Sequence, residues 1–165
     1  MLTPVKSRKI RGGGGSVAIV ASRYNARYVD AMLRAAQAEL KRARTAKVRV
    51  VRVPGAYEIP LVAAALARSS SARPDAIICL GVILRGETVH AAHIGDSVSR
   101  ALMGIQLQSG VPVIHEVLLL ENRPQADARC LSRKHNRGAE AAQTALAMVA
   151  VMRQVPFARR DSALA

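Results

Sequence analysis

The apolar run from Ala76 to Leu84 constrains the fold more than any other segment of the chain. It is far shorter than the ~20 residues that a membrane-spanning helix needs, and it is rich in β-branched residues. These properties predict an internal parallel strand buried on both faces. Gly86-Glu87-Thr88 and His90 follow it directly. Because open α/β sheets bind ligands beyond the carboxyl ends of their strands, we predict an active-site loop here, with backbone N–H groups and the Thr88 hydroxyl available to an anion.

The rest of the chain alternates strand-like and helix-like patterns. Repeated β-α units with right-handed crossovers predict an α/β fold, namely a three-layer αβα sandwich with a mostly parallel four-stranded sheet of the flavodoxin-like class. Apolar periodicity, Gly and Pro place the expected strands at 17–21, 48–53, 76–84 and 112–120, and the expected helices at 25–41, 58–68, 91–108, 124–129 and 136–153.

Length and composition indicate one domain. The chain has 165 residues, half of them hydrophobic, which suffices for a single core over 16–155. Residues 1–15 are basic and glycine-rich and are expected to form a flexible arm, and 156–165 a tail. The arm has no hydrophobic signal core, so we expect a cytoplasmic protein. Two cysteines, Cys79 and Cys130, are too few for a disulfide framework and lack metal-ligand spacing.

A net charge of +14 raises the question of nucleic-acid binding. The chain has three tyrosines, one phenylalanine and no tryptophan, so it offers no stacking platform for single strands, and no helix-turn-helix pattern is present. We therefore expect most of the charge to lie on solvated surface and tails, without specific nucleic-acid binding. The basic group 129–137 is the exception, because it contains positions that could meet a phosphate.

Five segments together carry a resemblance to one family, the lumazine synthases, over 17–152. Any one segment would be weak evidence, but their order and their positions at strand ends are specific. They are Ile19-Val20-Ala21-Ser22-Arg23-Tyr24-Asn25, Val53-Pro54-Gly55-Ala56-Tyr57-Glu58-Ile59-Pro60, Gly81 through His90, Gly110-Val111-Pro112-Val113-Ile114 and Asn136-Arg137-Gly138-Ala139-Glu140-Ala141-Ala142.

The resemblance implies a transferase of riboflavin biosynthesis. The family condenses 5-amino-6-(D-ribitylamino)uracil with 3,4-dihydroxy-2-butanone 4-phosphate to 6,7-dimethyl-8-ribityllumazine, and releases phosphate and water. It implies no metal and no organic cofactor, small-molecule substrates, no membrane partner, and a homo-oligomer. The expected ring is a homopentamer, alone or built into a decamer or a 60-subunit shell.

The resemblance also assigns residues to the pyrimidine substrate. Tyr24 would stack on the ring, a task suited to an aromatic face. The alternative is that Tyr24 packs on the helix below. The backbone of Val82, Ile83 and Leu84 would border the pocket. Ala56, Tyr57 and Glu58 would bind the ribityl chain, although Glu58 could instead only cap its helix.

For the second substrate, the resemblance implies that Gly86, Glu87 and Thr88 clamp the phosphate together with Arg129, whose fork can bond two oxygens. His90 would shuttle protons, as a group that titrates near neutrality can. The alternatives are a plain surface arginine and a structural histidine. Ile114 and His115 would also line the substrate site. Arg129 and His115 would complete the pocket of a neighbouring subunit.

Three departures from the family pattern stand out. The segment 91–96 reads Ala-Ala-His-Ile-Gly-Asp where the family commonly has aromatic and acidic residues, and His115 replaces an apolar or aromatic residue. Leu131 and His135 occupy turn positions that are glycine in shell-forming relatives. Two rival functions therefore stay open: a shell or scaffold paralogue with reduced activity, and a polyanion-binding protein on the same fold.

Overall fold

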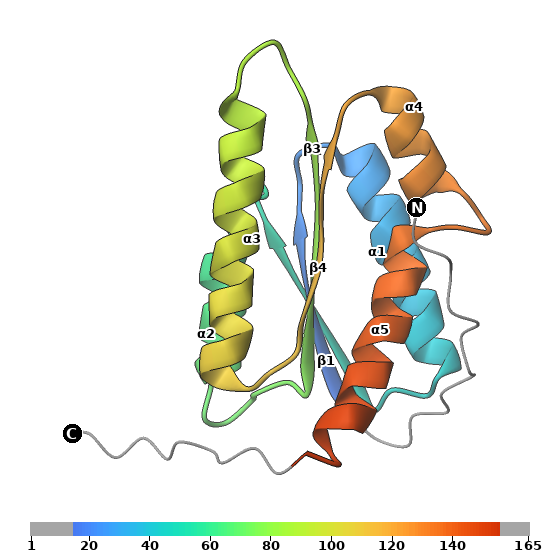
Figure 1. Cartoon of the computed structure of the whole chain (residues 1–165). Helices are drawn as coiled ribbons and strands as arrows, with labels where there is room; N and C mark the ends of the chain where they lie inside the picture. The colour runs from blue at the N-terminus through green and yellow to red at the C-terminus, as the bar shows by residue number, and fades with distance from the viewer. Residues whose placement is uncertain (1–14, 156–165) are drawn as a thin grey trace.

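The computed structural model describes residues 15–155 and contains one four-stranded sheet. All strand pairs are parallel, and the order across the sheet is β2-β1-β3-β4 (Figure 1). The predicted α/β class with a parallel sheet is confirmed. The strands are β1 (Ser16–Ser22), β2 (Lys47–Val53), β3 (Ala76–Leu84) and β4 (Val113–Leu120).

Helices cover both faces of the sheet (Figure 1). Helices α1 (Ala26–Arg42) and α5 (Arg137–Met152) lie on one face, and α2 (Ile59–Arg68) and α3 (His90–Ser109) lie on the other. Successive side chains of β3 alternate between the two cores: Ile78 enters the α1/α5 core and Ile77 the α2/α3 core. This double burial explains why β3 is an unbroken apolar run.

Helix boundaries differ from the predictions in two places that bear on the site. Helix α3 begins at His90 and not at residue 91. Asn25, expected as the first helical residue, lies before α1 with a φ of 56°, a left-handed conformation that asparagine tolerates. The amide of its side chain donates a hydrogen bond to the Val82 carbonyl of β3 at 2.8 Å. The turn after β1 is thereby attached to β3.

A helical segment is present where a helix was expected over 124–129, but it is not a single α-helix. The segment forms a short helix, α4 (Arg123–Ala126), that continues as a π-helical turn, η1 (Asp127–Leu131). Both ends of the segment are held by side chains: Asn122 accepts from the Gln125 N–H at 3.0 Å, and the Cys130 carbonyl accepts from the Asn136 amide. The C-terminal end of the segment is thus tied to the start of α5 through the Asn136 side chain.

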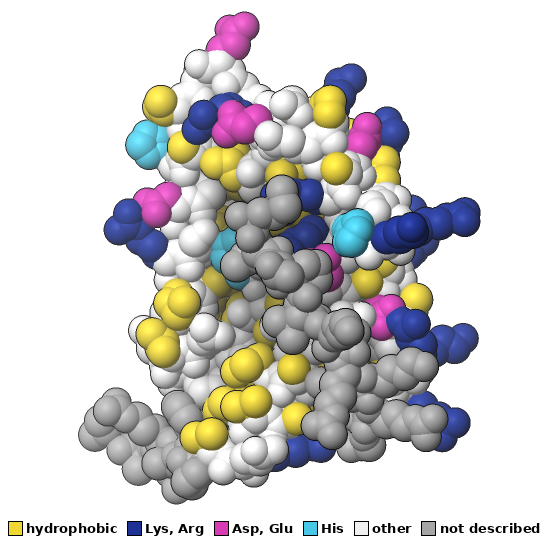
Figure 2. Space-filling view, turned by 45° about the vertical axis from the view of Figure 1, so that its right-hand side comes forward, with side chains coloured by type: hydrophobic (Ala, Val, Ile, Leu, Met, Phe, Trp, Pro, Cys, Tyr) yellow, Lys and Arg dark blue, Asp and Glu magenta, His cyan; other side chains and the backbone are white. Residues whose placement is uncertain are grey.

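Charged side chains are dispersed over the described surface. Acidic side chains lie among basic ones in Figure 2, and some arginines are paired, as Arg52 is with Asp30 at 2.6 Å. Within 15–155, no helix has both the length and the apolar character needed to cross a bilayer. The expected arm and tail lie outside the described residues, apart from Gly15.

Candidate active site

Three loops meet at the carboxyl edge of the sheet. The backbone N–H of Arg23 donates to the Val53 carbonyl at 2.8 Å, and the N–H of Tyr24 donates to the Pro54 carbonyl at 3.0 Å. These bonds join the turn after β1 to the turn after β2. Because Asn25 is bonded to β3 in addition, the ends of three neighbouring strands form one fixed surface. This is the edge where parallel sheets place their ligands.

Tyr24 lies on this surface with its ring exposed. The side chain is 69% exposed, and the ring lies over Gly55, where an added Cβ would come within 2.9 Å of it. Glu58 belongs to the same cluster, since its carboxylate accepts from the Gly55 N–H at 2.8 Å. Tyr24 therefore packs on a glycine turn and not on a helix, and it presents a π-face to solvent.

The other residues assigned to the pyrimidine substrate surround this cluster. Ala56 is buried, Tyr57 is exposed, and Glu58 is half-buried just before α2. Val82 is buried in the α1/α5 core, so only its backbone can border a ligand. Ile83 and Leu84 are partly buried and pack against the two cores with their side chains. Glu58 serves the turn after β2 through one carboxylate oxygen and makes no side-chain cap to α2.

The predicted phosphate loop is open to solvent. Gly86, Glu87, Thr88 and His90 are all exposed, and a Cβ at Gly86 would meet no heavy atom within 4 Å in the described chain. The loop joins β3 to α3 beyond the sheet (Figure 1). His90 is the first residue of α3, a helix N-terminus whose unpaired N–H groups favour an anion.

The remaining predicted site residues are Ile114, His115 and Arg129, which lie on β4 and η1. Ile114 is buried in the α1/α5 core. His115 lies on the edge strand β4, paired in register with Cys79 well below the end of β3, and its Nε2 is 2.8 Å from the Ser99 hydroxyl of α3. Arg129 is exposed on η1. The structure thus separates His115 from the surface that carries Tyr24.

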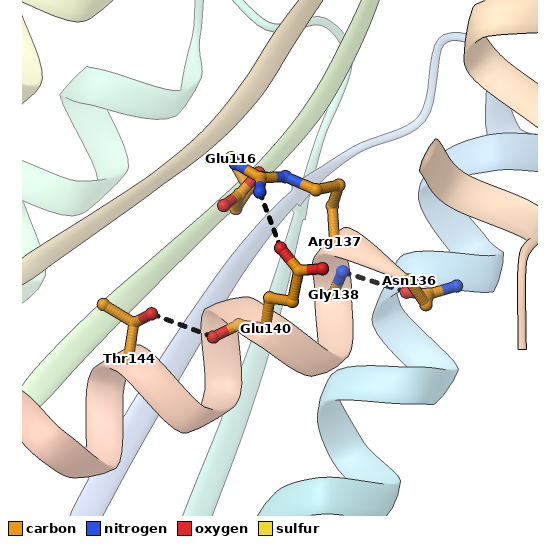
Figure 3. A network of polar contacts seen from close by, with 6 residues as sticks. All are labelled: Glu116, Asn136, Arg137, Gly138, Glu140 and Thr144. Atoms are coloured by element: carbon orange, nitrogen blue, oxygen red, sulfur yellow. Dashed lines mark hydrogen bonds and ion pairs between the residues drawn. The ribbon is translucent and has the colours of Figure 1, made fainter. Parts of the chain in front are cut away.

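The sequence analysis missed a buried ion pair on β4. Arg137 donates from Nε to Glu116 at 3.0 Å, and from Nη1 to Glu140 at 2.6 Å (Figure 3). Burial raises the pKa of Glu116 to about 7, and the attraction of Arg137 opposes that rise without cancelling it. The available signal was a glutamate at an inward-facing position of a strand in which His115 is the only other residue that is not apolar.

The fold and the loop cluster define an α/β protein with a candidate ligand surface at the carboxyl edge of a parallel sheet. Residues 14–153 match the family model described as 6,7-dimethyl-8-ribityllumazine synthase. A protein of that name from Stenotrophomonas maltophilia (strain R551-3) is 43% identical over 84% of this chain and 90% of its own length. Another from Xylella fastidiosa (strain M12) is 41% identical over 89% of this chain and 96% of its own length.

The chain belongs to the 6,7-dimethyl-8-ribityllumazine synthase family. It is accordingly a transferase of riboflavin biosynthesis, and the polyanion-binding and scaffold alternatives are not favoured.

Proposed function

We propose that the Tyr24 cluster holds the pyrimidine substrate of this reaction, in which 5-amino-6-(D-ribitylamino)uracil condenses with 3,4-dihydroxy-2-butanone 4-phosphate. The observation that carries the proposal is the exposed Tyr24 ring fixed over Gly55 beside the Glu58 carboxylate. A flat heterocycle can stack on that ring, and the turn after β2 then lies beside the substituent of the heterocycle. The product is 6,7-dimethyl-8-ribityllumazine, with release of phosphate and water.

The ribityl chain needs polar groups that converge on its hydroxyls. Ala56 and Tyr57 offer backbone groups at the turn, and the Val82–Leu84 backbone borders the same edge. Glu58 already accepts one backbone N–H through a single oxygen, which leaves its carboxylate able to accept a hydroxyl as well. The bond of Glu58 to the turn after β2 is therefore compatible with a role in binding the ribityl chain.

The phosphate of the second substrate is assigned to Gly86, Glu87 and Thr88 at the start of α3, together with Arg129. The exposure of this loop and its place before a helix N-terminus support an anion there. His90 follows this loop as the first residue of α3. There its side chain can transfer the protons that are exchanged during Schiff-base formation and phosphate elimination. The π-helical turn beneath Arg129 is a rare conformation that is frequent at functional sites.

We infer that His115 and Arg129 act in the pocket of a neighbouring subunit, in a homopentameric ring. The separation of His115 from the Tyr24 surface supports this, because one chain alone leaves the pocket incomplete. Exposed apolar side chains on α2 and α3 support an interface: Leu61, Met103 and Leu107. A cytoplasmic location and a reaction without cofactor stay predictions of the sequence.

Competition by inorganic phosphate tests the assignment of Arg129. We expect inorganic phosphate to compete with the butanone phosphate in the wild-type protein and to lose most of that effect in Arg129→Ala. Arg123→Ala is a matched control, since Arg123 is an exposed arginine on the neighbouring α4. Normal phosphate competition in Arg129→Ala would remove Arg129 from the site and leave the anion to the loop before α3.

A further inference from the structure

Glu116 is a costly residue for its place in the fold. Among residues 15–155 it is the only charged side chain in the buried class, at 6% exposure. Its neighbours on the same face of β4 are the apolar Ile114, Leu118 and Leu120. A buried carboxylate loses its hydration, and a well-packed apolar side chain is often at least as stable in such a position. Packing of β4 therefore does not explain a glutamate here.

Glu116 holds one specific partner. The guanidinium of Arg137 lies between the Glu116 and Glu140 carboxylates and is bonded to both, at 3.0 and 2.6 Å (Figure 3). Glu116 belongs to β4, whereas Arg137 and Glu140 belong to the first turn of α5. The pair thus fixes the start of α5 to the edge of the sheet by a charge-assisted hydrogen bond.

The start of α5 is bonded in turn to the segment that carries Arg129. Asn136 precedes α5, and its side-chain oxygen accepts from the Gly138 N–H at 2.9 Å. The amide of the same side chain donates to the carbonyl of Cys130, in the π-helical turn η1. Cys130 is adjacent to Arg129, so a continuous path of bonds leads from Glu116 through Arg137 and Asn136 to the backbone beside Arg129.

The charged and titratable groups that face Glu116 come from two elements. The charged Arg137 and Glu140 face it from α5, and the charged Arg129 and the neutral thiol of Cys130 face it from η1. Arg129 attracts the Glu116 carboxylate, and Glu140 repels it. An ionised Glu116 is therefore linked to η1 in two ways: by the path of hydrogen bonds through Arg137 and Asn136, and by electrostatic attraction to Arg129.

We propose that Glu116 is a positioning residue for the phosphate-bearing substrate: through Arg137 and Asn136 it fixes the π-helical turn that presents Arg129. The inference rests on the proposed role of Arg129. It assigns no contact between Glu116 and substrate, and it predicts that loss of the Glu116 charge affects one substrate selectively.

The test measures KM for each substrate separately, from pH 6 to pH 8.5, in the wild type and in Glu116→Gln. The glutamine keeps the shape and an oxygen that can accept from Arg137, but it removes the negative charge of the acceptor and with it the ion pair. At pH 8.5 we expect KM for the butanone phosphate to rise about fivefold, with KM for the pyrimidine unchanged. At pH 6 the Glu116 side chain of the wild type is itself protonated and neutral, like the glutamine. The variant and the wild type should therefore have nearly the same KM for the butanone phosphate at pH 6.

Two further variants keep the test decisive. Asn136→Ser retains a helix-capping oxygen but loses the bond to the Cys130 carbonyl, so it should raise the same KM by a factor that does not vary with pH. It decides the question if Glu116→Gln fails to fold. Glu39→Gln is the matched control, because Glu39 is a half-buried carboxylate paired with Arg42 on α1, and we expect both of its KM values to equal those of the wild type.

The outcomes separate the two proposals. An unchanged butanone phosphate KM in Glu116→Gln at pH 8.5, or an equal rise for both substrates, would overturn the positioning role. Arg129→Ala is measured in parallel. If Arg129→Ala leaves that KM unchanged, the assignment of Arg129 fails and the inference fails with it. If Arg129→Ala raises it while Asn136→Ser and Glu116→Gln do not, the positioning role of Glu116 is overturned and the assignment of Arg129 stands.

Discussion

Gly138 is the residue whose enlargement should most disturb the contact between α1 and α5. It is the second residue of α5 and lies against the backbone of Met32 on α1. A Cβ at Gly138 would lie 2.6 Å from the Met32 Cα, 2.5 Å from its carbonyl carbon and closer still to the carbonyl oxygen. Backbone atoms on both sides cannot rotate away, so Gly138→Ala requires the two helices to separate.

The size of the effect follows from that geometry. Normal carbon–carbon contacts need roughly 3.5 Å, so α5 must move by about 1 Å from α1. Overpacking of a well-packed core costs about 1–3 kcal/mol, and a clash between backbones falls at the upper end. Alanine regains at most about 1 kcal/mol of helix propensity over glycine. We therefore expect Gly138→Ala to lower the free energy of unfolding by about 2 kcal/mol.

Urea unfolding followed by circular dichroism, at one fixed protein concentration, measures this change. Gly104→Ala is the matched control: Gly104 is in the interior of α3, and a Cβ there meets no heavy atom within 4 Å in the described chain. It should stabilise the protein by about 0.5–1 kcal/mol. Equal stability of the two variants would refute the close approach of α5 to α1.

Three other predictions address the site. Tyr24→Ala should weaken pyrimidine binding by ~1–3 kcal/mol and leave butanone phosphate binding unchanged, and equal losses in KM would make Tyr24 a packing residue. Arg129→Ala should reduce turnover more than His90→Ala, because proton shuttling contributes ~10²–10⁴-fold and substrate groups or water can replace it in part; steady-state rates of both variants with intact assembly decide the order. Glu116→Gln should gain stability relative to wild type as pH rises. Burial raises the folded-state pKa of Glu116 from 4.5 to about 7, so the ionised form costs roughly 3 kcal/mol above pH 7 and nothing below pH 4.5; urea unfolding at pH 5 and pH 8.5 with no difference in the Gln effect would contradict this.

The sequence predicts the fold well because each strand and helix has a local signal. The apolar run of β3 requires burial on both faces. The loop 86–88 directly follows β3 in the sequence, so its place at the carboxyl edge of the sheet does not depend on how the helices pack. These features depend on residues that are close together in the sequence. Tyr24 was assigned through the family resemblance, and its exposed position over Gly55 was not predicted.

Features that depend on distant partners were not predictable in the same way. The ion pair of Glu116 and Arg137 joins residues 21 positions apart, and its geometry exists only once α5 lies against β4. The end of the π-helical turn is likewise held by the Asn136 side chain, which donates to the Cys130 carbonyl from the start of α5. No local pattern specifies either, because propensity and periodicity report on single elements and not on the contacts between them.

Formation of 6,7-dimethyl-8-ribityllumazine tests the central claim most directly. The purified full-length chain is mixed with 5-amino-6-(D-ribitylamino)uracil and 3,4-dihydroxy-2-butanone 4-phosphate, and the fluorescence of the lumazine is followed beside a protein-free control. We predict a rate well above that control, which is saturable in both substrates and accompanied by release of one phosphate per lumazine. Product formation no faster than in the protein-free mixture, with the protein folded and assembled, would contradict the account.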